Sequence, residues 1–365
     1  MFLVVTRNFP PDVGGMQILM AGLSENLLNH GPVKVFTYEY PNSNVYDKKS
    51  SIDIERVKGI KLFRKYRKAN LVNDFINRNP SIRAIITDHW KSLELVKTEY
   101  LRKIKSFCLL HSKEINHEIN SLLNKRLIKS TNKADYIIAN SNFTKNLAIK
   151  VGIDPSKIHI IFPGIEKPKL IENVTKIRAE KIFGQSFPKI ITVARLDKRK
   201  GHDKILMLIK NLKPKFPKIK YVSIGFGDEE NSLLKLSKEL CLEKEVIFLK
   251  NIDHDLKTAL IAEANLFLMP SRIDKKSVEG FGISFIEAAS YGVASIGGKD
   301  GGASDAISHN KTGLICDGNN FNSIYDSVID FFQDEKFIKF GKNSKKFSEK
   351  FYWNNIVKNY LKLIN

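Results

Sequence analysis

Short apolar runs recur along the chain, and most are followed by a loop and then by a stretch with helical spacing of apolar residues. We interpret these runs as buried strands, because they are too short for buried helices and are bounded by turn residues. They cover residues 2–6, 33–38, 84–87, 107–110, 134–139, 158–162, 190–194, 221–224, 246–249, 266–269, 294–296 and 314–316. Strands that alternate with helices predict an α/β fold of parallel sheets with helical crossovers.

The alternation is interrupted once, at residues 165–188, which contain only a short basic helix. A chain of 365 residues is too long for one ordinary core and suits two domains. We therefore predict one domain at 1–165 and a second at 166–347. The remaining segment, 348–365, carries apolar residues at helical spacing from Trp353 to Ile364 and is predicted to be a helix.

Several chemically active residue types follow predicted strands of the first series. Parallel sheets bind ligands outside the carboxyl ends of their strands, and Gly14, Gly15, Asp88 and His111 lie at such ends. Gly14 and Gly15 precede a helix expected at 18–28, and such a loop presents backbone N–H groups to an anion, although a plain tight turn has the same sequence. His111 is open to two interpretations, since a lone histidine after a strand is more often packed or hydrogen-bonded than catalytic.

The second series carries a cluster of cations directly after the strand at 190–194. Arg195, Lys198, Arg199 and Lys200 precede the helix expected at 203–212, an arrangement suited to clamping a diphosphate. The alternative is a solvated turn.

Residues 278–292 combine two carboxylates with a glycine-rich turn. Glu279 and Glu287 stand eight positions apart, with Gly280 and Gly282 between them and a helix expected from near Ile283. Eight positions leave the two side chains about 80° apart around a helix, so they cannot pair on one face. They can hold two parts of one elongated ligand by accepting hydrogen bonds from its hydroxyls. The alternative is an ordinary strand-to-helix turn.

The net charge of +21 favours anionic partners, which include nucleic acid, anionic lipid and anionic glycan. A lysine-rich solvated surface is the alternative. The stretch 56–68 mixes apolar residues with cations, which fits contact with a membrane surface. No module that reads nucleic acid is recognisable, so we expect no nucleic-acid partner.

Composition predicts a cytoplasmic protein. No apolar run reaches the roughly 18–20 residues that span a bilayer. The opening run reads as a first strand rather than a leader. Cys108, Cys241 and Cys316 are odd in number and lie among apolar residues, so we expect reduced, buried thiols. No Cys/His cluster has metal-ligand spacing, so no metal site is predicted.

Seven motifs, taken together, resemble the retaining glycosyltransferases of family 4. The stretch from Glu279 to Glu287 resembles the E-x7-E motif of that family. The others are the Pro-Pro-Asp-Val-Gly-Gly-Met-Gln opening and the segments 193–201, 224–228, 269–272 and 301–305, with the Asn-Lys-Thr-Gly-Leu turn of 310–314 in addition. In style they are closest to the GDP-mannose-dependent phosphatidylinositol-mannoside mannosyltransferases of the family. One departure is Pro163-Gly164, where the family usually has Asn-Gly.

The resemblance implies the GT-B fold: two Rossmann-like, doubly wound domains facing a cleft, with the C-terminal helix crossing back to the N-terminal domain. It implies an N-terminal domain that binds the acceptor and a C-terminal domain that binds the nucleotide sugar. The implied reaction is retaining, metal-independent transfer of a hexose, with mannose favoured, to a lipid or glycan acceptor. The donor would be GDP-mannose or a UDP-sugar, and no other cofactor is implied.

Three alternatives stay open. The first is a glycosyltransferase that uses a UDP-sugar in cell-surface polysaccharide synthesis. The second is a sugar-nucleotide epimerase with the GT-B fold, and the third is a basic nucleic-acid-binding protein. Peripheral contact with the cytoplasmic face of the membrane is compatible with the first reading and with the lipid-acceptor reading.

The resemblance also assigns roles to residues. Arg195 and Lys200 would neutralise the leaving diphosphate, Glu279 would accept hydroxyls of the donor sugar, and His111 would lie by the reacting centre. Acceptor contacts are implied for Gln17 and Asp88. Donor contacts are implied for Gly14, Gly15, Gly225, Gly227, Lys250, Ile252, Gly280, Phe281, Gly282, Ile283 and Glu287.

Overall fold

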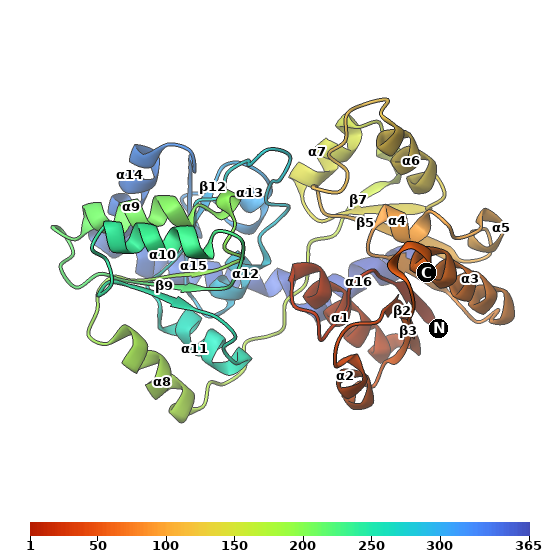
Figure 1. Cartoon of the computed structure of the whole chain (residues 1–365), viewed down its shortest axis with the longest axis horizontal. Helices are drawn as coiled ribbons and strands as arrows, with labels where there is room; N and C mark the ends of the chain where they lie inside the picture. The colour runs from red at the N-terminus through yellow and green to blue at the C-terminus, as the bar shows by residue number, and fades with distance from the viewer. The chain divides into compact units, whose positions relative to one another are not determined.

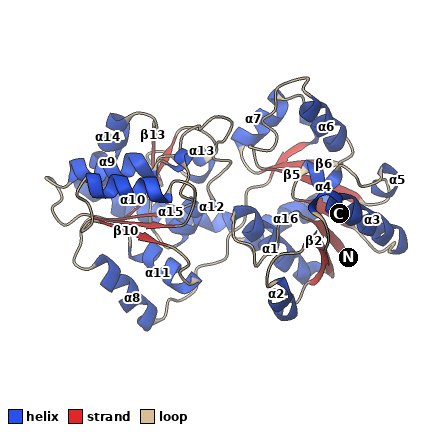
Figure 2. Cartoon of the chain, viewed as in Figure 1, coloured by secondary structure: helices blue, strands red, loops and turns tan.

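The computed structural model describes all 365 residues and divides into two compact units. Unit 1 consists of Met1–Glu166 together with Phe351–Asn365, and unit 2 consists of Lys167–Lys350. Each unit is a parallel β-sheet with helices packed on it (Figures 1 and 2). The two units are described separately.

The sheet of unit 1 has seven parallel strands in the order β3-β2-β1-β4-β5-β6-β7. The strand order reverses between β1 and β4, so the loops after these two strands meet at the switch point of the sheet. The strands are β1 (Phe2–Val5), β2 (Val33–Tyr38), β3 (Asp53–Val57), β4 (Ala84–Thr87), β5 (Lys105–Leu110), β6 (Tyr136–Ala139) and β7 (Ile158–Ile160).

Both faces of this sheet are buried, which explains why its central strands are continuously apolar. In β1, Phe2 and Val4 belong to one core cluster, whereas Leu3 and Val5 belong to the other. The helices are α1 (Gly15–Leu27), α2 (Ser43–Lys49), α3 (Lys61–Arg78), α4 (Trp90–Leu93), α5 (Thr98–Leu101), α6 (Leu122–Thr131), α7 (Asn142–Lys150) and α16 (Trp353–Ile364).

Helix α16 packs on α1, which confirms the prediction that the terminal helix returns to the N-terminal part of the chain. Its first residue, Trp353, is 4% exposed. The indole ring lies against Gly22 of α1 and against Gly164, and a Cβ at Gly22 would come within 2.5 Å of the ring. Glycine is therefore required at both positions by the close approach of the tryptophan.

Unit 2 repeats the architecture with six parallel strands in the order β10-β9-β8-β11-β12-β13. Here the order reverses between β8 and β11. The strands are β8 (Lys189–Val193), β9 (Lys220–Ile224), β10 (Val246–Leu249), β11 (Leu266–Met269), β12 (Ser295–Gly298) and β13 (Gly313–Cys316). The helices are α8 (Asn173–Phe183), α9 (His202–Leu212), α10 (Glu230–Glu239), α11 (His254–Glu263), α12 (Ile283–Ser290), α13 (Ala303–Ala306), α14 (Phe321–Phe332) and α15 (Lys336–Ser348).

Every predicted strand is present, with bounds within about two residues of those expected. Strand β3 was missed, because it is an edge strand whose charged residues are partly exposed and break the apolar run. The expectation of buried thiols is correct for Cys108 and Cys316 but wrong for Cys241, which is exposed. No helix has the length and apolar character needed to cross a bilayer.

Candidate active site

The loops after β8 and β11 meet at the switch point of unit 2. The backbone N–H of Arg272, after β11, donates to the carbonyl of Arg199, after β8, at 2.8 Å. Gly201 has a φ of 78°, and a Cβ there would lie 2.6 Å from the carbonyl oxygen of Pro270. The two loops are thus packed backbone against backbone at the edge where ligands of such sheets bind.

Glu279 is the centre of this edge, and two cations of the β8 loop hold it. Its Oε2 accepts a hydrogen bond from Arg199 Nη1 at 2.8 Å and another from Lys200 Nζ. Burial alone would raise the pKa of Glu279, but the adjacent Lys200 and Arg199 lower it to about 2. Glu279 is therefore an anionic hydrogen-bond acceptor at neutral pH, a state suited to sugar hydroxyls.

Lys200 is buried and Arg195 is exposed, so the predicted clamp consists of two different kinds of cation. Burial lowers the pKa of Lys200, and the Glu279 carboxylate opposes that effect. Arg195 has no ion-pair partner within the protein, which leaves its guanidinium available to a ligand. Sequence reasoning grouped Arg199 with the clamp but missed its pairing with Glu279, because the two residues are far apart along the chain.

The glycines before α12 open the backbone toward this edge. Gly282 caps the helix in the left-handed conformation, with a φ of 89° and no side-chain cap, so the first N–H groups of α12 stay available for an anion. The backbone N–H of Gly302 donates to the carbonyl of Glu279 at 2.9 Å and fixes the loop. Phe281 is 2% exposed, so its ring packs in the core and does not reach a donor.

Two further predicted glycines have a packing reason for being glycine. A Cβ at Gly225 would collide with the carbonyl of Ala194, and one at Gly227 would collide with the backbone of Leu196. The loop after β9 therefore lies directly on the loop that carries Arg195. Gly225 and Gly227 support the position of that arginine, whether or not they also touch a donor.

The residues expected near the nucleoside lie around α11 and α12. Glu287, one turn into α12, pairs with Lys257 of α11 at 3.3 Å. Lys250, directly after β10, is exposed and pairs with Glu230 at 2.7 Å. Ile252 is partly exposed in the same loop. The carboxylates Glu279 and Glu287 have separate cationic partners.

In unit 1, Gly14 and Gly15 lie at the start of α1, because the helix begins at Gly15 rather than at the expected Ile18. Gly14 has no side-chain cap, so this N-terminus also presents backbone N–H groups. Gln17 is 8% exposed, and its Nε2 donates to Asp12 Oδ2 at 2.6 Å. The Gln17 amide therefore stabilises the glycine loop. To contact the acceptor substrate directly, this amide would have to share its hydrogen bond with Asp12.

Asp88, directly after β4, is buried and holds neighbouring segments in place. Its Oδ2 accepts from Thr6 Oγ1 at 3.0 Å and from the Arg7 N–H at 2.9 Å, and its Oδ1 accepts from Ser92 Oγ at 2.6 Å. The residue is 2% exposed. Asp88 thus joins the ends of β1 and β4, and its side chain has little capacity left for an acceptor.

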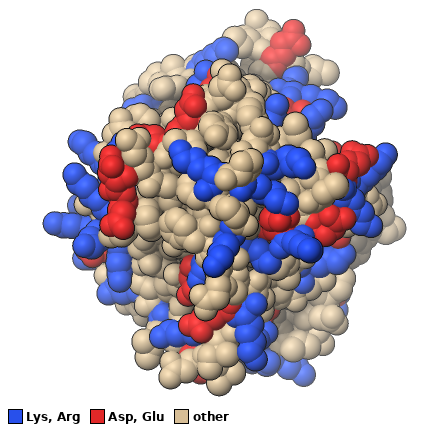
Figure 3. All heavy atoms as spheres, turned by 90° about the vertical axis from the view of Figure 1, so that its left-hand side faces the viewer, with Lys and Arg blue, Asp and Glu red and all other residues tan.

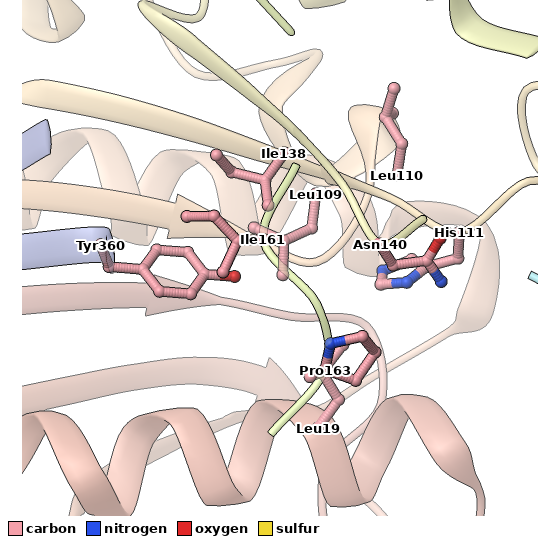
Figure 4. Close-up of a pocket in the computed structure, with 9 residues that line it drawn as sticks. All are labelled: Leu19, Leu109, Leu110, His111, Ile138, Asn140, Ile161, Pro163 and Tyr360. Carbon is pink, nitrogen blue, oxygen red and sulfur yellow. The ribbon is translucent and has the colours of Figure 1, made fainter. Parts of the chain in front are cut away.

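His111 is partly exposed after β5, and its ring orientation is fixed. Nε2 lies 3.0 Å from the Asp88 carbonyl oxygen, so Nε2 carries the proton and Nδ1 is left as an acceptor. The ring lies beside Asn140 at the rim of a small cavity (Figure 4). Leucine, isoleucine, proline and tyrosine side chains line its interior, among them Tyr360 of α16.

The face shown in Figure 3 carries basic and acidic side chains intermixed rather than gathered by sign. The described residues contain no group of three His, Cys, Asp or Glu that could hold a metal ion.

Comparison with known proteins identifies two family models along the chain. Residues 13–167 match "Glycosyltransferase Family 4", and residues 173–350 match "Glycosyl transferases group 1". A GDP-mannose-dependent alpha-(1-6)-phosphatidylinositol monomannoside mannosyltransferase of Mycolicibacterium smegmatis is 23% identical over 355 residues, covering 92% of this chain and 90% of the relative. A 4-alpha-N-acetylgalactosaminyltransferase of Campylobacter jejuni, acting on a diphospho-undecaprenol-linked sugar by its name, is 31% identical over 237 residues, covering 64% and 60%.

Solved structures show the same fold at low identity. Anabaena Alr3699/HepE in complex with UDP superposes with a TM-score of 0.82 at 17% identity, covering 99% of this chain and 98% of that one. A sucrose-phosphate synthase from Thermosynechococcus elongatus superposes with a TM-score of 0.80 at 19% identity, covering 100% and 98%. The chain belongs to the family 4 (group 1) glycosyltransferases of GT-B fold, enzymes that transfer a sugar from a nucleotide sugar.

Proposed function

We propose that this glycosyltransferase moves a hexose, with mannose favoured, from a nucleoside diphosphate sugar to a lipid or glycan acceptor, with retention of configuration and without a metal. The observation that carries the proposal is the Glu279 carboxylate held by Arg199 and Lys200 just before the uncapped N-terminus of α12. One edge of unit 2 thus offers a hydrogen-bond acceptor for the hydroxyls of a sugar together with hydrogen-bond donors for a diphosphate.

The chemistry follows from where charge develops. As the bond between the anomeric carbon and the phosphate oxygen breaks, negative charge grows on the diphosphate. Arg195, Lys200 and the N–H groups of α12 stabilise that charge. Arg199 stays with Glu279, so the carboxylate keeps a counter-ion while Lys200 turns to the phosphate.

Retention is proposed to occur on the front face of the sugar. The acceptor oxygen forms its bond to the anomeric carbon on the side that the phosphate leaves, and the acceptor proton passes to the leaving phosphate oxygen. His111 offers its Nδ1 to a sugar hydroxyl at the reacting centre. NMR of the product tests this step: the new bond should have the anomeric configuration of the donor, and inversion would exclude it.

Nucleotide preference is the test of the donor. We expect GDP to raise the melting temperature more than UDP or ADP does, with the same result in EDTA, because ligands that bind the folded state stabilise it. Arg195→Ala should weaken GDP binding roughly ten- to hundred-fold, since a hydrogen bond to a charged group contributes about 1.5–3 kcal/mol. Calorimetry measures the change.

Arg178→Ala is the matched control, because Arg178 is half exposed on α8 and pairs only with the exposed Asp253. Preference for UDP would keep the glycosyltransferase and replace mannose by the sugar of a UDP donor, the kind of ligand held by Anabaena HepE. Absence of binding to any of the three nucleotides would contradict the proposed function.

We also propose that unit 1 contacts an anionic membrane surface, at the cytoplasmic face, through the first two turns of α3 and the residue before them. Ile60, Leu62, Phe63 and Tyr66 are 74%, 69%, 56% and 50% exposed. Lys61 and Lys65 are exposed among them, which combines apolar area with positive charge. The rest of the 56–68 stretch contributes less than expected, because Lys68 is buried and Arg56 is paired with Asp47.

Vesicle sedimentation tests this contact. The double variant Lys61→Glu with Lys65→Glu should bind phosphatidylglycerol vesicles at least about 30-fold more weakly, since each of the two basic residues near an anionic surface contributes about 1 kcal/mol. Its GDP binding should be unchanged. Lys235→Glu with Lys238→Glu, an exposed pair on α10, makes the same charge change in unit 2. Equal loss in both double variants would show a general charge effect and refute the contact.

A further inference from the structure

The switch point of unit 1 gathers cations that have no role in the donor site. Arg7 follows β1 and His89 follows β4, the two strands between which the order reverses. Helix α3 brings Arg64 and Lys68 to the same place. Its Lys68 Nζ donates to the carbonyl of Thr6 at 2.6 Å, directly before Arg7.

The ring of Tyr38, at the end of β2, holds the two α3 cations together. Lys68 Nζ lies 4.3 Å and Arg64 Cζ lies 4.9 Å from the ring centroid. The Nε of Arg64 is buried and has no hydrogen-bond partner in the structure. Lys68 is 3% exposed and uses its charge on a carbonyl and a ring, without a carboxylate bonded to it.

Arg7 influences the other titratable groups of this cluster through its charge. Its charge acts on Tyr38, Lys68, His89 and Lys91, so all four lie within its reach. Its guanidinium has no ion-pair partner. Burial, followed by the charges of Arg7 and its neighbours, lowers the pKa of His89 to about 2, so that ring is neutral. Since His89 Nδ1 accepts from the Lys91 N–H at 2.9 Å, its proton is on Nε2.

Negative charge at this place is insufficient to balance the cations. Asp88 is the carboxylate in the cluster, and its two oxygens already accept three hydrogen bonds from Thr6, Arg7 and Ser92. Glu94, the next acidic side chain near Lys91, is held by Arg126 at 2.7 and 2.9 Å. The three cations Arg7, Arg64 and Lys68 therefore have one carboxylate near them, that of Asp88, and its oxygens already accept other hydrogen bonds.

We propose that Arg7, Arg64, Lys68 and His89 form an anion site that binds a phosphate group of the acceptor. The proposal rests on the proposed function and specifies its acceptor as a phosphate-bearing molecule. Guanidinium groups match phosphate oxygens in a bidentate way, and the Nε2 proton of His89 adds a neutral donor. A bound phosphate supplies the counter-charge that the buried ammonium of Lys68 lacks.

The edge position also suits an acceptor. The carbonyl of Asp88 between the carboxyl ends of β4 and β5 fixes the ring of His111, so the anion site and the proposed reacting centre in unit 1 share one residue. A phosphate held at Arg7 would place the rest of the acceptor beside His111. Asp88 connects the anion site to His111, because its side chain also accepts a hydrogen bond from the Arg7 backbone N–H.

The experiment measures phosphate binding to the full chain. Inorganic phosphate and glycerol phosphate are titrated by calorimetry, with sodium chloride at equal ionic strength as the reference. Arg7→Gln and Lys68→Met should each weaken phosphate binding at least ten-fold. Arg102→Gln, an exposed arginine of the same unit, should leave it unchanged. GDP binding is measured on every variant and should stay at the wild-type value.

The outcomes separate the two levels of the proposal. Phosphate affinity that is equal in wild type, Arg7→Gln and Lys68→Met, or no greater than that for chloride, would overturn the anion site even if GDP still binds. If the wild-type protein binds none of GDP, UDP and ADP, the proposed function is overturned instead. Lys68→Met removes a buried charge and is expected to fold; Arg7→Gln, at a partly exposed position, tests the site independently.

A second arm distinguishes the source of the phosphate. Tighter binding to dispersed phosphatidylglycerol than to glycerol phosphate, lost in Arg7→Gln, supports the site with a lipid headgroup as its ligand. Equal affinity for the two supports it with a soluble phosphorylated acceptor. Binding of phosphatidylglycerol that Arg7→Gln leaves intact would place the lipid at the exposed part of α3 and count against the anion site as a headgroup site.

Discussion

Replacing Glu279 with glutamine should lower the turnover of sugar transfer at least 100-fold, because the anion that we propose accepts the sugar hydroxyls is lost and the two cations are left without their shared carboxylate. Unit 2 should lose about 3–5 kcal/mol of stability, the usual cost of removing one partner from a buried ion pair. Nucleotide release from the donor measures turnover, and urea unfolding measures stability.

The pH dependence of that loss has a definite sign. The pKa of Glu279 in the folded protein is about 2, below its ordinary value of 4.5, so the pairing stabilises the fold above about pH 4.5 and is lost as the pH falls toward 2. The stability difference between wild type and Glu279→Gln should therefore be constant from pH 5 to 7 and shrink below pH 4. Glu239→Gln, which changes an exposed i,i+4 pair on α10, is the control. Wild-type turnover in Glu279→Gln would refute the assigned role.

Replacing Trp353 with alanine should destabilise unit 1 by about 3–5 kcal/mol, since a large aromatic side chain is removed from a site that two glycines shape around it. Nothing else can fill that space without moving α16 away from α1. Both tryptophans of the chain, Trp90 and Trp353, lie in unit 1, so the remaining Trp90 reports the unfolding of this unit by fluorescence.

Lys358→Ala is the control for this change, because Lys358 is exposed on the same helix. It should shift the urea midpoint little, while Trp353→Ala lowers it clearly. GDP binding, which we propose for unit 2, should survive the tryptophan substitution at temperatures where unit 1 stays folded. A midpoint equal to that of the wild type would show that α16 contributes little to unit 1.

The strands could be predicted from the sequence because both faces of each sheet are buried, which makes the central strands continuously apolar. Strand β3 escaped because only one of its edges is paired, so it tolerates Asp53, Glu55 and Arg56. The start of α1 was placed late, since two glycines looked like loop although they begin the helix. The local pattern thus predicts burial well and helix ends less well.

The candidate site could be predicted from the sequence only in part. The residue types at Arg195, Lys200 and Glu279 were recognisable as a motif, but the pairing of Arg199 with Glu279 depends on which loops the sheet order brings together. The cluster at Arg7 and His89 escaped for the same reason, because the adjacency of β1 and β4 is a property of topology. The sequence of α3 shows its charges, but it does not show that Lys68 turns inward.

Unit 1 is assembled from both ends of the chain, with the whole of unit 2 between them. During synthesis, the apolar side of α1 that receives Trp353 stays uncovered until residues 351–365 have been made. Unit 2 is continuous in sequence and can complete its own core before that moment. The expected order of folding therefore runs against the order of translation: the second unit closes first, and the first must be kept from aggregating until its last helix arrives.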